Sequence, residues 1–201
     1  MPQILILAAH PQLHLSRTTR ALIDAARGAG LGRVELRDLY ALYPDFLIDV
    51  QAEQAALEAA QLVVWLHPIQ WYSMPPLMKL WLDEVLSYPW AYGAGGSHLR
   101  GKDLWLVAST GGSEASYHPG GYNRYFFDAF LPPYEQTATL CGLRFLPPLL
   151  LHGAHAVSHE ELQAHVEVFI ERLRSYPDWP ELADMQSCPE CIVPPSERPQ
   201  A

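Results

Sequence analysis

The chain has 201 residues, of which 49% are hydrophobic and 17% charged, and its formal net charge is −9 at pH 7. This length and composition fit one folded domain with a full hydrophobic core and argue against intrinsic disorder. The negative charge repels polyanions, so nucleic acid and anionic membrane surfaces are poor candidates for a primary partner.

Strand-like and helix-like segments alternate along the chain. Short apolar runs predict strands, and apolar residues at helical spacing behind an N-cap residue or a proline predict helices. In chain order we expect a strand at 4–9, a helix at 16–27, a strand at 34–36, a helix at 51–60, a strand at 62–66, a helix at 75–86 and a strand at 104–108. Each strand is therefore followed by a helix.

The second half of the chain continues this alternation, with prolines at two of its boundaries. A helix is predicted within 126–141, where Pro132-Pro133 must interrupt it or mark its true start. A fifth strand follows at 144–152, with Pro147-Pro148 at its beginning or at a bulge, and a last helix at 158–174. Five strands alternating with helices indicate a doubly wound α/β fold, a parallel sheet in the order 2-1-3-4-5 with helices on both faces.

The C-terminal part of the chain has a different composition. Prolines recur from Pro177 onward, so we assign 1–176 to the folded domain and 177–201 to an irregular, proline-rich tail. Cys188 and Cys191 in this tail form half a zinc site at most, and the histidines show no recognised ligand spacing. We therefore expect neither a metal site nor a disulfide framework.

The apolar runs are much shorter than the roughly 18 residues of a membrane span. The N-terminus also lacks the basic and apolar regions of a secretion signal. We expect a soluble, cytoplasmic protein.

The most unusual residues lie in the loops after the first, third and fourth predicted strands. In a doubly wound sheet these loops meet at the carboxyl ends of the strands, where ligands bind. The first loop places hydroxyls and an arginine at a helix N-terminus, which suits a phosphate, although ordinary capping by Ser16 explains it equally well. The residues concerned are His10, Ser16, Arg17, Thr18 and Thr19.

The other two loops have features suited to a flat heterocycle. The loop after the third strand holds two aromatic residues between hydrogen-bonding ones, and the loop after the fourth holds paired glycines that permit close backbone approach. Each loop also has a purely structural explanation. The aromatics of the first could pack into the core or a dimer contact, and the glycines of the second could form a simple turn. The two sets are Ile69, Gln70, Trp71 and Tyr72, and Ser109, Thr110, Gly111 and Gly112.

Several motifs together carry a family resemblance. They are Ala8-Ala9-His10-Pro11, the segment from Leu39 to Phe46, the segment from His67 to Trp81, Trp90-Ala91-Tyr92-Gly93 and Thr110-Gly111-Gly112. Over residues 3–175 the chain resembles the flavodoxin-like NAD(P)H:quinone oxidoreductases. Within that family it is most similar to the ancillary subunits of glutathione-gated potassium-efflux systems.

The resemblance implies an FMN enzyme, with FAD a weaker candidate, that works as a homodimer. NAD(P)H would reduce the flavin and leave before a quinone accepts two electrons, a ping-pong hydride transfer catalysed by an NAD(P)H dehydrogenase (quinone). The first loop would bind the ribityl phosphate, and the other two loops the isoalloxazine ring. The resemblance also implies an ancillary role at a potassium/proton antiporter, which would place the protein peripherally at the inner membrane.

One position departs from the larger quinone reductases, which have a catalytic Tyr followed six residues later by a His. Tyr117 matches the first of these residues, but Asn123 occupies the second position, and the adjacent His118 is the candidate substitute. Tyr117 and His118 are therefore the candidate catalytic side chains, with the redox chemistry left to the flavin itself. The alternatives are a non-catalytic regulatory subunit of a potassium-efflux system and a flavodoxin-type electron carrier.

Overall fold

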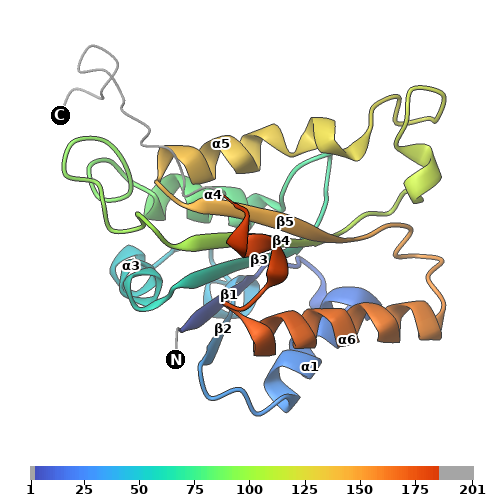
Figure 1. The fold of residues 1–201 in the computed structure, drawn as a ribbon, viewed down its shortest axis with the longest axis horizontal. Helices are drawn as coiled ribbons and strands as arrows, with labels where there is room; N and C mark the ends of the chain where they lie inside the picture. The colour runs from blue at the N-terminus through green and yellow to red at the C-terminus, as the bar shows by residue number, and fades with distance from the viewer. Residues whose placement is uncertain (1–2, 186–201) are drawn as a thin grey trace.

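A computed structural model of the chain describes residues 3–185. Within these residues the strands form one parallel sheet of five strands in the order β2-β1-β3-β4-β5, with helices on both faces (Figure 1). The strands are β1 (Ile4–Ala8), β2 (Val34–Asp38), β3 (Leu62–Pro68), β4 (Asp103–Ser109) and β5 (Arg144–Leu151). The predicted doubly wound, flavodoxin-like fold is confirmed.

The helices divide between the two faces because residues alternate along each strand. Ile4 and Ile6 pack with α1 and α6 on one face, whereas Leu5 and Leu7 pack with α3, α4 and α5 on the other (Figure 1). The helices are α1 (Arg17–Gly28), α2 (Leu39–Leu42), α3 (Val50–Ala59), α4 (Pro76–Val85), α5 (Pro132–Leu140) and α6 (His159–Ser175), and the 3-10 turns are η1 (Leu13–Leu15), η2 (Glu114–Ser116), η3 (Phe127–Phe130) and η4 (Pro180–Ala183). Among residues 3–185, no helix combines the length and hydropathy needed to cross a membrane.

Local sequence signals explain where several helices begin. The Ser16 side chain accepts the backbone N–H of Thr19 at the start of α1, and Ser158 with Glu161 forms a capping box at the start of α6. Pro132 begins α5, so the paired prolines mark the true start of that helix.

The strand β5 is continuous in spite of its two prolines. It lies at the edge of the sheet, where a missing N–H costs least, and its register against β4 shifts between Trp105 and Val107. The indole N–H of Trp105 donates to the carbonyl oxygen of Pro147 at 3.1 Å. The prolines therefore produce a bulge rather than a strand boundary.

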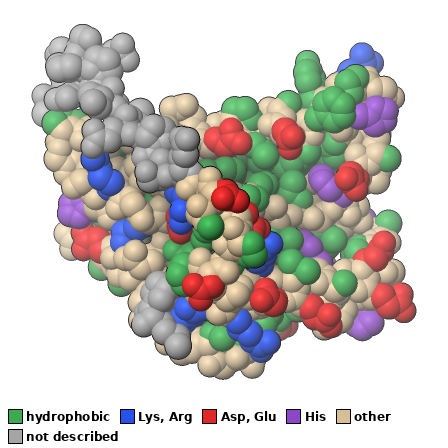
Figure 2. All heavy atoms as spheres, in the orientation of Figure 1, with side chains coloured by type: hydrophobic (Ala, Val, Ile, Leu, Met, Phe, Trp, Pro, Cys, Tyr) green, Lys and Arg blue, Asp and Glu red, His purple; other side chains and the backbone are tan. Residues whose placement is uncertain are grey.

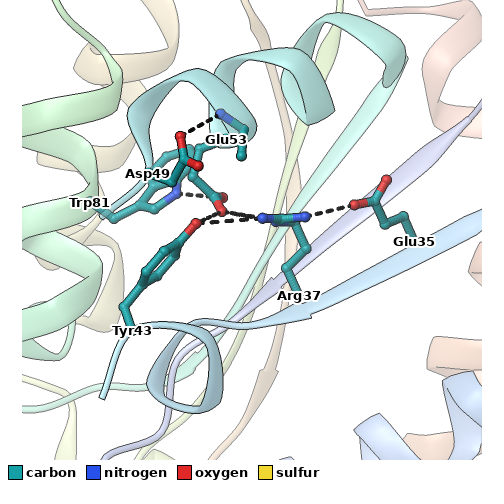
Figure 3. Close-up of polar contacts among 7 residues, drawn as sticks. Glu35, Arg37, Tyr43, Asp49, Glu53 and Trp81 are labelled. Carbon is teal, nitrogen blue, oxygen red and sulfur yellow. Dashed lines mark hydrogen bonds and ion pairs between the residues drawn. The ribbon is translucent and has the colours of Figure 1, made fainter. Parts of the chain in front are cut away.

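A buried polar cluster joins β2, α3 and α4 (Figure 3). The carboxylate of Glu53, which is fully buried, accepts Nη2 of Arg37 at 2.6 Å, Nε1 of Trp81 at 2.8 Å and the hydroxyl of Tyr43. Burial, with the neighbouring carboxylate, raises the pKa of Tyr43. Three structural elements are thus held together by one carboxylate.

The residues directly after α6 pack into the core, although the sequence assigns them to the tail. Trp179 is buried, lies edge-on to Trp105 with a ring separation of 5.0 Å, and receives the guanidinium of Arg172 on its face. Leu182 belongs to the same hydrophobic cluster. The remaining residues of the predicted tail, including Cys188 and Cys191, lie outside the described residues.

Candidate functional site

A cavity of about 420 Å³ lies at the carboxyl ends of β1, β3 and β4. It is lined by residues of all three loops that the sequence singled out, and by the loop after β5. The expected residues among its lining are His10, Ser16, Arg17, Thr18, Ile69, Gln70, Ser109, Thr110 and Gly111. Its volume falls within the range typical of small-molecule sites.

The start of α1 forms one end of the cavity. The N–H groups of Arg17 and Thr18 belong to the first helical turn, where no intrahelical acceptor exists, so they can bind an anion. The N–H of Thr19 is already bonded to the Ser16 hydroxyl at 3.1 Å, and Thr19 does not line the cavity. One guanidinium nitrogen of Arg17 donates to the carbonyl of Val157 at 3.3 Å, which fixes the side chain beside this end.

The loop after β3 is a tight hairpin turn built without glycine. Gln70 and Ser73 exchange both backbone hydrogen bonds, at 2.9 and 3.0 Å, and the two residues between them have positive φ, 49° at Trp71 and 62° at Tyr72. These are the dihedral signs of a type I′ turn, which Asn and Gly usually occupy. Non-glycine residues in this conformation cost about 1–3 kcal/mol each and cluster at ligand sites.

This turn determines which backbone donors are available. The N–H of Gln70 is used within the turn, and the N–H of Ile69 donates to the carbonyl of Ser109 at 2.7 Å. The N–H groups of Trp71 and Tyr72 have no acceptor among the described residues. The Trp71 side chain is 94% exposed, so it is not a core residue.

The loop after β4 also leaves two backbone donors available. The N–H of Thr110 donates to the carbonyl of Leu151 at 2.9 Å, whereas those of Gly111 and Gly112 have no acceptor among the described residues. A Cβ at Gly112 would lie 2.6 Å from the hydroxyl of Tyr122. A side chain at Gly112 would therefore have to displace this hydroxyl, whereas glycine leaves room for it.

A second, smaller cavity of about 240 Å³ adjoins the first, and Ile69 lines both. Its other lining residues are Trp71, Tyr72, Gly112, Tyr117, Tyr122 and Asn123. Burial raises the pKa of the Tyr117 phenol, so this hydroxyl stays protonated as a donor at neutral pH. The second cavity is thus a mainly aromatic chamber beside the first.

The two candidate substitutes for a histidine near Tyr117 have different environments. Asn123 is buried, donates to the Ser116 hydroxyl at 2.8 Å and accepts the Tyr72 hydroxyl at 3.3 Å, so it holds the second cavity together. His118 is exposed, accepts the backbone N–H of Gly120 at 3.0 Å and lines neither cavity. The structure therefore does not bring His118 to the site.

The loop after β5 contributes residues that the sequence did not indicate. Ala154 and His155 line the main cavity, together with Gln12, Leu15 and Pro68 from the other loops. The N–H of Ala154 donates to the carbonyl of Thr110 at 2.9 Å, which joins the two loops. The only available signal was position, because a loop after a fourth parallel strand at the same edge must lie near the others.

The donor set fits FMN. One end of the main cavity offers helix N–H groups, hydroxyls and an arginine for a phosphate. The loops after β3 and β4 offer four free backbone N–H groups, one at Gly111 in the main cavity and three at residues that line the adjoining one. Burial lowers the pKa of His10, so its ring is neutral at pH 7 and its Nδ1 accepts the N–H of Gln12 at 3.1 Å. No carboxylate is among the residues that line either cavity.

Comparison with known proteins agrees with this architecture. The sequence pattern of the flavodoxin-like fold family matches residues 2–174, so the chain belongs to that family. The glutathione-regulated potassium-efflux system ancillary protein KefF of Citrobacter koseri is 47% identical over 173 residues, which cover 86% of this chain and 96% of that protein.

Two solved structures show the same similarity. General stress protein 14 of Treponema denticola, in complex with FMN, superposes with a TM-score of 0.81 at 37% identity and covers 87% of this chain and 99% of its own. An NADPH-quinone reductase from P. pentosaceus superposes with a TM-score of 0.76 at 27% identity, and the match covers 84% of this chain and 96% of that protein. The resemblance predicted from the sequence motifs is therefore confirmed.

Proposed function

We propose that the protein binds FMN in the 420 Å³ cavity and catalyses two-electron transfer from NAD(P)H to a quinone. The observation that carries this proposal is the cavity itself, which has free helix N–H groups at one end and is lined by Gly111, whose N–H has no acceptor among the described residues. Three more such N–H groups belong to residues of the adjoining cavity, Trp71, Tyr72 and Gly112. The FMN bound to a similar chain and the quinone reductase activity named for another support it. When bound, FMN supplies hydride acceptance from NAD(P)H and electron transfer to the quinone.

The residues of this chain have separate tasks in the proposal. Ser16, Arg17 and Thr18 bind the phosphate, the last two through N–H groups of the first turn of α1. The N–H groups of Gly111 and Gly112, which have no acceptor among the described residues, would stabilise negative charge that develops on the ring. Tyr117 donates a hydrogen bond at the edge of the second cavity.

The second cavity is proposed to receive the nicotinamide and the quinone in turn, which gives a ping-pong mechanism. Flat aromatic ligands pack well against the rings of Trp71, Tyr72 and Tyr122. Such a chamber favours an enzyme over a one-electron carrier, which needs no separate substrate pocket. Because the net charge of −9 repels the NAD(P)H phosphates, their binding must depend on local hydrogen-bond donors rather than on the overall electrostatic field.

We also propose that the protein assembles as a homodimer and serves as the ancillary subunit of a potassium-efflux transporter on the cytoplasmic face of the inner membrane. The name and 47% identity of the KefF relative support the transporter partner. Hydrophobic side chains gather at the corner of the molecule where segment 113–130 lies (Figure 2), and Tyr122, Tyr125 and Phe126 are exposed there. This surface supports a contact with a second copy.

The test of the cofactor is to purify the protein, identify the released flavin by mass and titrate it anaerobically with NADH and NADPH. We expect FMN, and bleaching of its absorbance by at least one nicotinamide. The variant Gly112→Ala should bind FMN at least 10-fold more weakly, because its Cβ would collide with Tyr122 and Ser116. The matched variant Gly28→Ala, whose Cβ meets nothing within 4 Å, should bind normally.

The outcomes distinguish the functions. A protein that stays colourless after incubation with FMN would overturn the cofactor proposal. FMN binding without bleaching by either nicotinamide would favour the electron carrier. For the transporter, co-purification with a potassium-efflux antiporter and loss of its gating in the Gly112→Ala variant would support a regulatory role, and absence of both would refute it.

A further inference from the structure

His152 is the first residue after β5, and the proposed function gives it no task. It lines neither cavity, yet its Nδ1 lies 3.0 Å from the hydroxyl oxygen of Thr110, which lines the main one. Its ring also lies 5.3 Å from those of Tyr117 and Phe127. One half-buried imidazole therefore touches a residue of each cavity.

The hydrogen bonds around Thr110 assign the direction of this contact. The Thr110 hydroxyl donates to the carbonyl of Gly112 at 2.7 Å, which uses its single hydrogen. The Nδ1 of His152 must then be the donor to Thr110. The backbone N–H of Gly153 donates to the same Gly112 carbonyl at 2.8 Å. Two consecutive residues of the β5 loop thus hold both ends of the 110–112 turn.

The charge around His152 agrees with a neutral Nδ1–H ring. Burial lowers the pKa of His152, and the carboxylate of Glu114, on η2, opposes that shift. The Thr110 hydroxyl is the polar group bonded to the ring, Tyr117 contacts it through its aromatic ring and is itself hydrogen-bonded to Thr110, and η3 contributes the apolar ring of Phe127. At neutral pH the imidazole is therefore uncharged and donates a hydrogen bond through Nδ1–H.

We propose that His152 is a positioning residue for the flavin site, with two separable actions. Through Nδ1–H it fixes the Thr110 hydroxyl and the turn that presents the free N–H groups of Gly111 and Gly112. Through its ring, with Phe127, it holds the Tyr117 phenol at the second cavity. This inference rests on the proposed function, since the groups that it positions are those proposed to contact the flavin and its substrates.

Two substitutions separate these actions. His152→Phe keeps a ring against Tyr117 but removes the donor, so FMN should bind about 3- to 10-fold more weakly, the effect of one lost hydrogen bond, and the flavin midpoint potential should fall. His152→Asn keeps an N–H near the position of Nδ1 but removes the ring. It should retain FMN within about 2-fold and instead lower kcat or raise KM for the quinone.

A matched control comes from the amino ends of the strands, in the segment before β4. His98 stacks on Trp90 at 5.1 Å and contacts Glu58 through Nδ1, so His98→Phe also keeps a ring and loses a polar contact. We expect its FMN affinity and midpoint potential to match the parent protein. Equal shifts in His98→Phe and His152→Phe would overturn the proposal, because they would reflect general destabilisation.

The apoprotein supplies a readout that needs no flavin. Long-range ¹H–¹⁵N spectra of histidine-labelled apoprotein at pH 7.5 should show His152 as the neutral Nδ1–H tautomer, with the signal assigned by its loss in His152→Asn. An Nε2–H tautomer would overturn the proposal. If the parent protein fails to bind FMN at all, the proposed function fails, whereas normal binding and potential in His152→Phe refute the role of His152 alone.

Discussion

The carboxylate of Glu53 offers the sharpest test of what holds the fold together. In Glu53→Gln the side chain keeps its size, but one oxygen becomes an amide that faces a donor, either Trp81 or the pair of Arg37 and Tyr43. Breaking a buried ion pair from one side costs about 3–5 kcal/mol. Arg37 retains its contact with Glu35 at 3.0 Å, so we expect the lower end, about 3 kcal/mol.

The assay is urea denaturation of the apoprotein, with thermal unfolding as a second measure. A loss of about 3 kcal/mol should lower the melting temperature by about 6–12 °C in a chain of this size. The control is Glu35→Gln, which removes the half-exposed partner of the same Arg37 and should cost about 0–1 kcal/mol.

Equal losses in Glu53→Gln and Glu35→Gln would refute the reasoning, because burial would then not matter to the pair. A double-mutant cycle between Glu53→Gln and Arg37→Gln should show a coupling above about 1 kcal/mol, since the two groups are in direct contact.

Three further predictions concern the turn, the core and the end of the domain. Trp71→Asn should raise the free energy of unfolding of the apoprotein by about 0.5–1 kcal/mol, because Asn tolerates the left-handed conformation better. The same variant should retain less FMN, because it lacks the indole ring. An apoprotein less stable than the parent would contradict this prediction. Complete burial lowers the pKa of His67 in the folded protein to about 4. As the pH falls below about 6.5, the unfolded chain takes up a proton at this residue but the folded protein does not. The stability that is present above pH 6.5 is therefore lost as the pH falls towards 4. Between pH 7 and pH 4.5, the His67→Gln variant should lose about 2.4 kcal/mol less of its free energy of unfolding than the parent, measured by urea titration. Equal pH dependence of the two proteins would refute the assignment. Trp179→Ala should cost about 3–5 kcal/mol, against under about 1 kcal/mol for the exposed Val168→Ala, and equal costs would exclude 177–185 from the core.

Much of the fold follows from the sequence because its signals are local. Ser16, Ser158 and Pro132 each begin a helix where their capping chemistry predicts. The third strand is longer than predicted and reaches Pro68, because the polar His67 is buried by tertiary packing that its residue type does not indicate. The course of β5 through Pro147 likewise depends on its place at the edge of the sheet.

The sequence indicates which loops meet at the cavity but not which hydrogen bonds form there. The three indicated loops do meet. No sequence pattern shows, however, that the N–H of Gln70 donates a hydrogen bond within the turn or that Trp71 and Tyr72 adopt positive φ. Trp179 was missed because prolines surround it, and His152 because it acts through Thr110 rather than on a cavity. Such assignments depend on which donors the tertiary fold has already used.

The scattered origin of the cavity has a consequence for how the chain refolds. Its lining comes from residues 10–18, 68–70, 109–111 and 154–155, so no early hairpin or single βαβ unit contains it. Contacts of such large sequence separation form late, after the entropy of closing long loops has been overcome. An intermediate in which β5 has not yet docked on β4 would lack Ala154 and His155 at the cavity. During refolding, FMN binding should therefore appear later than the helical circular dichroism signal. The delay between the two signals would measure how long β5 takes to dock on β4.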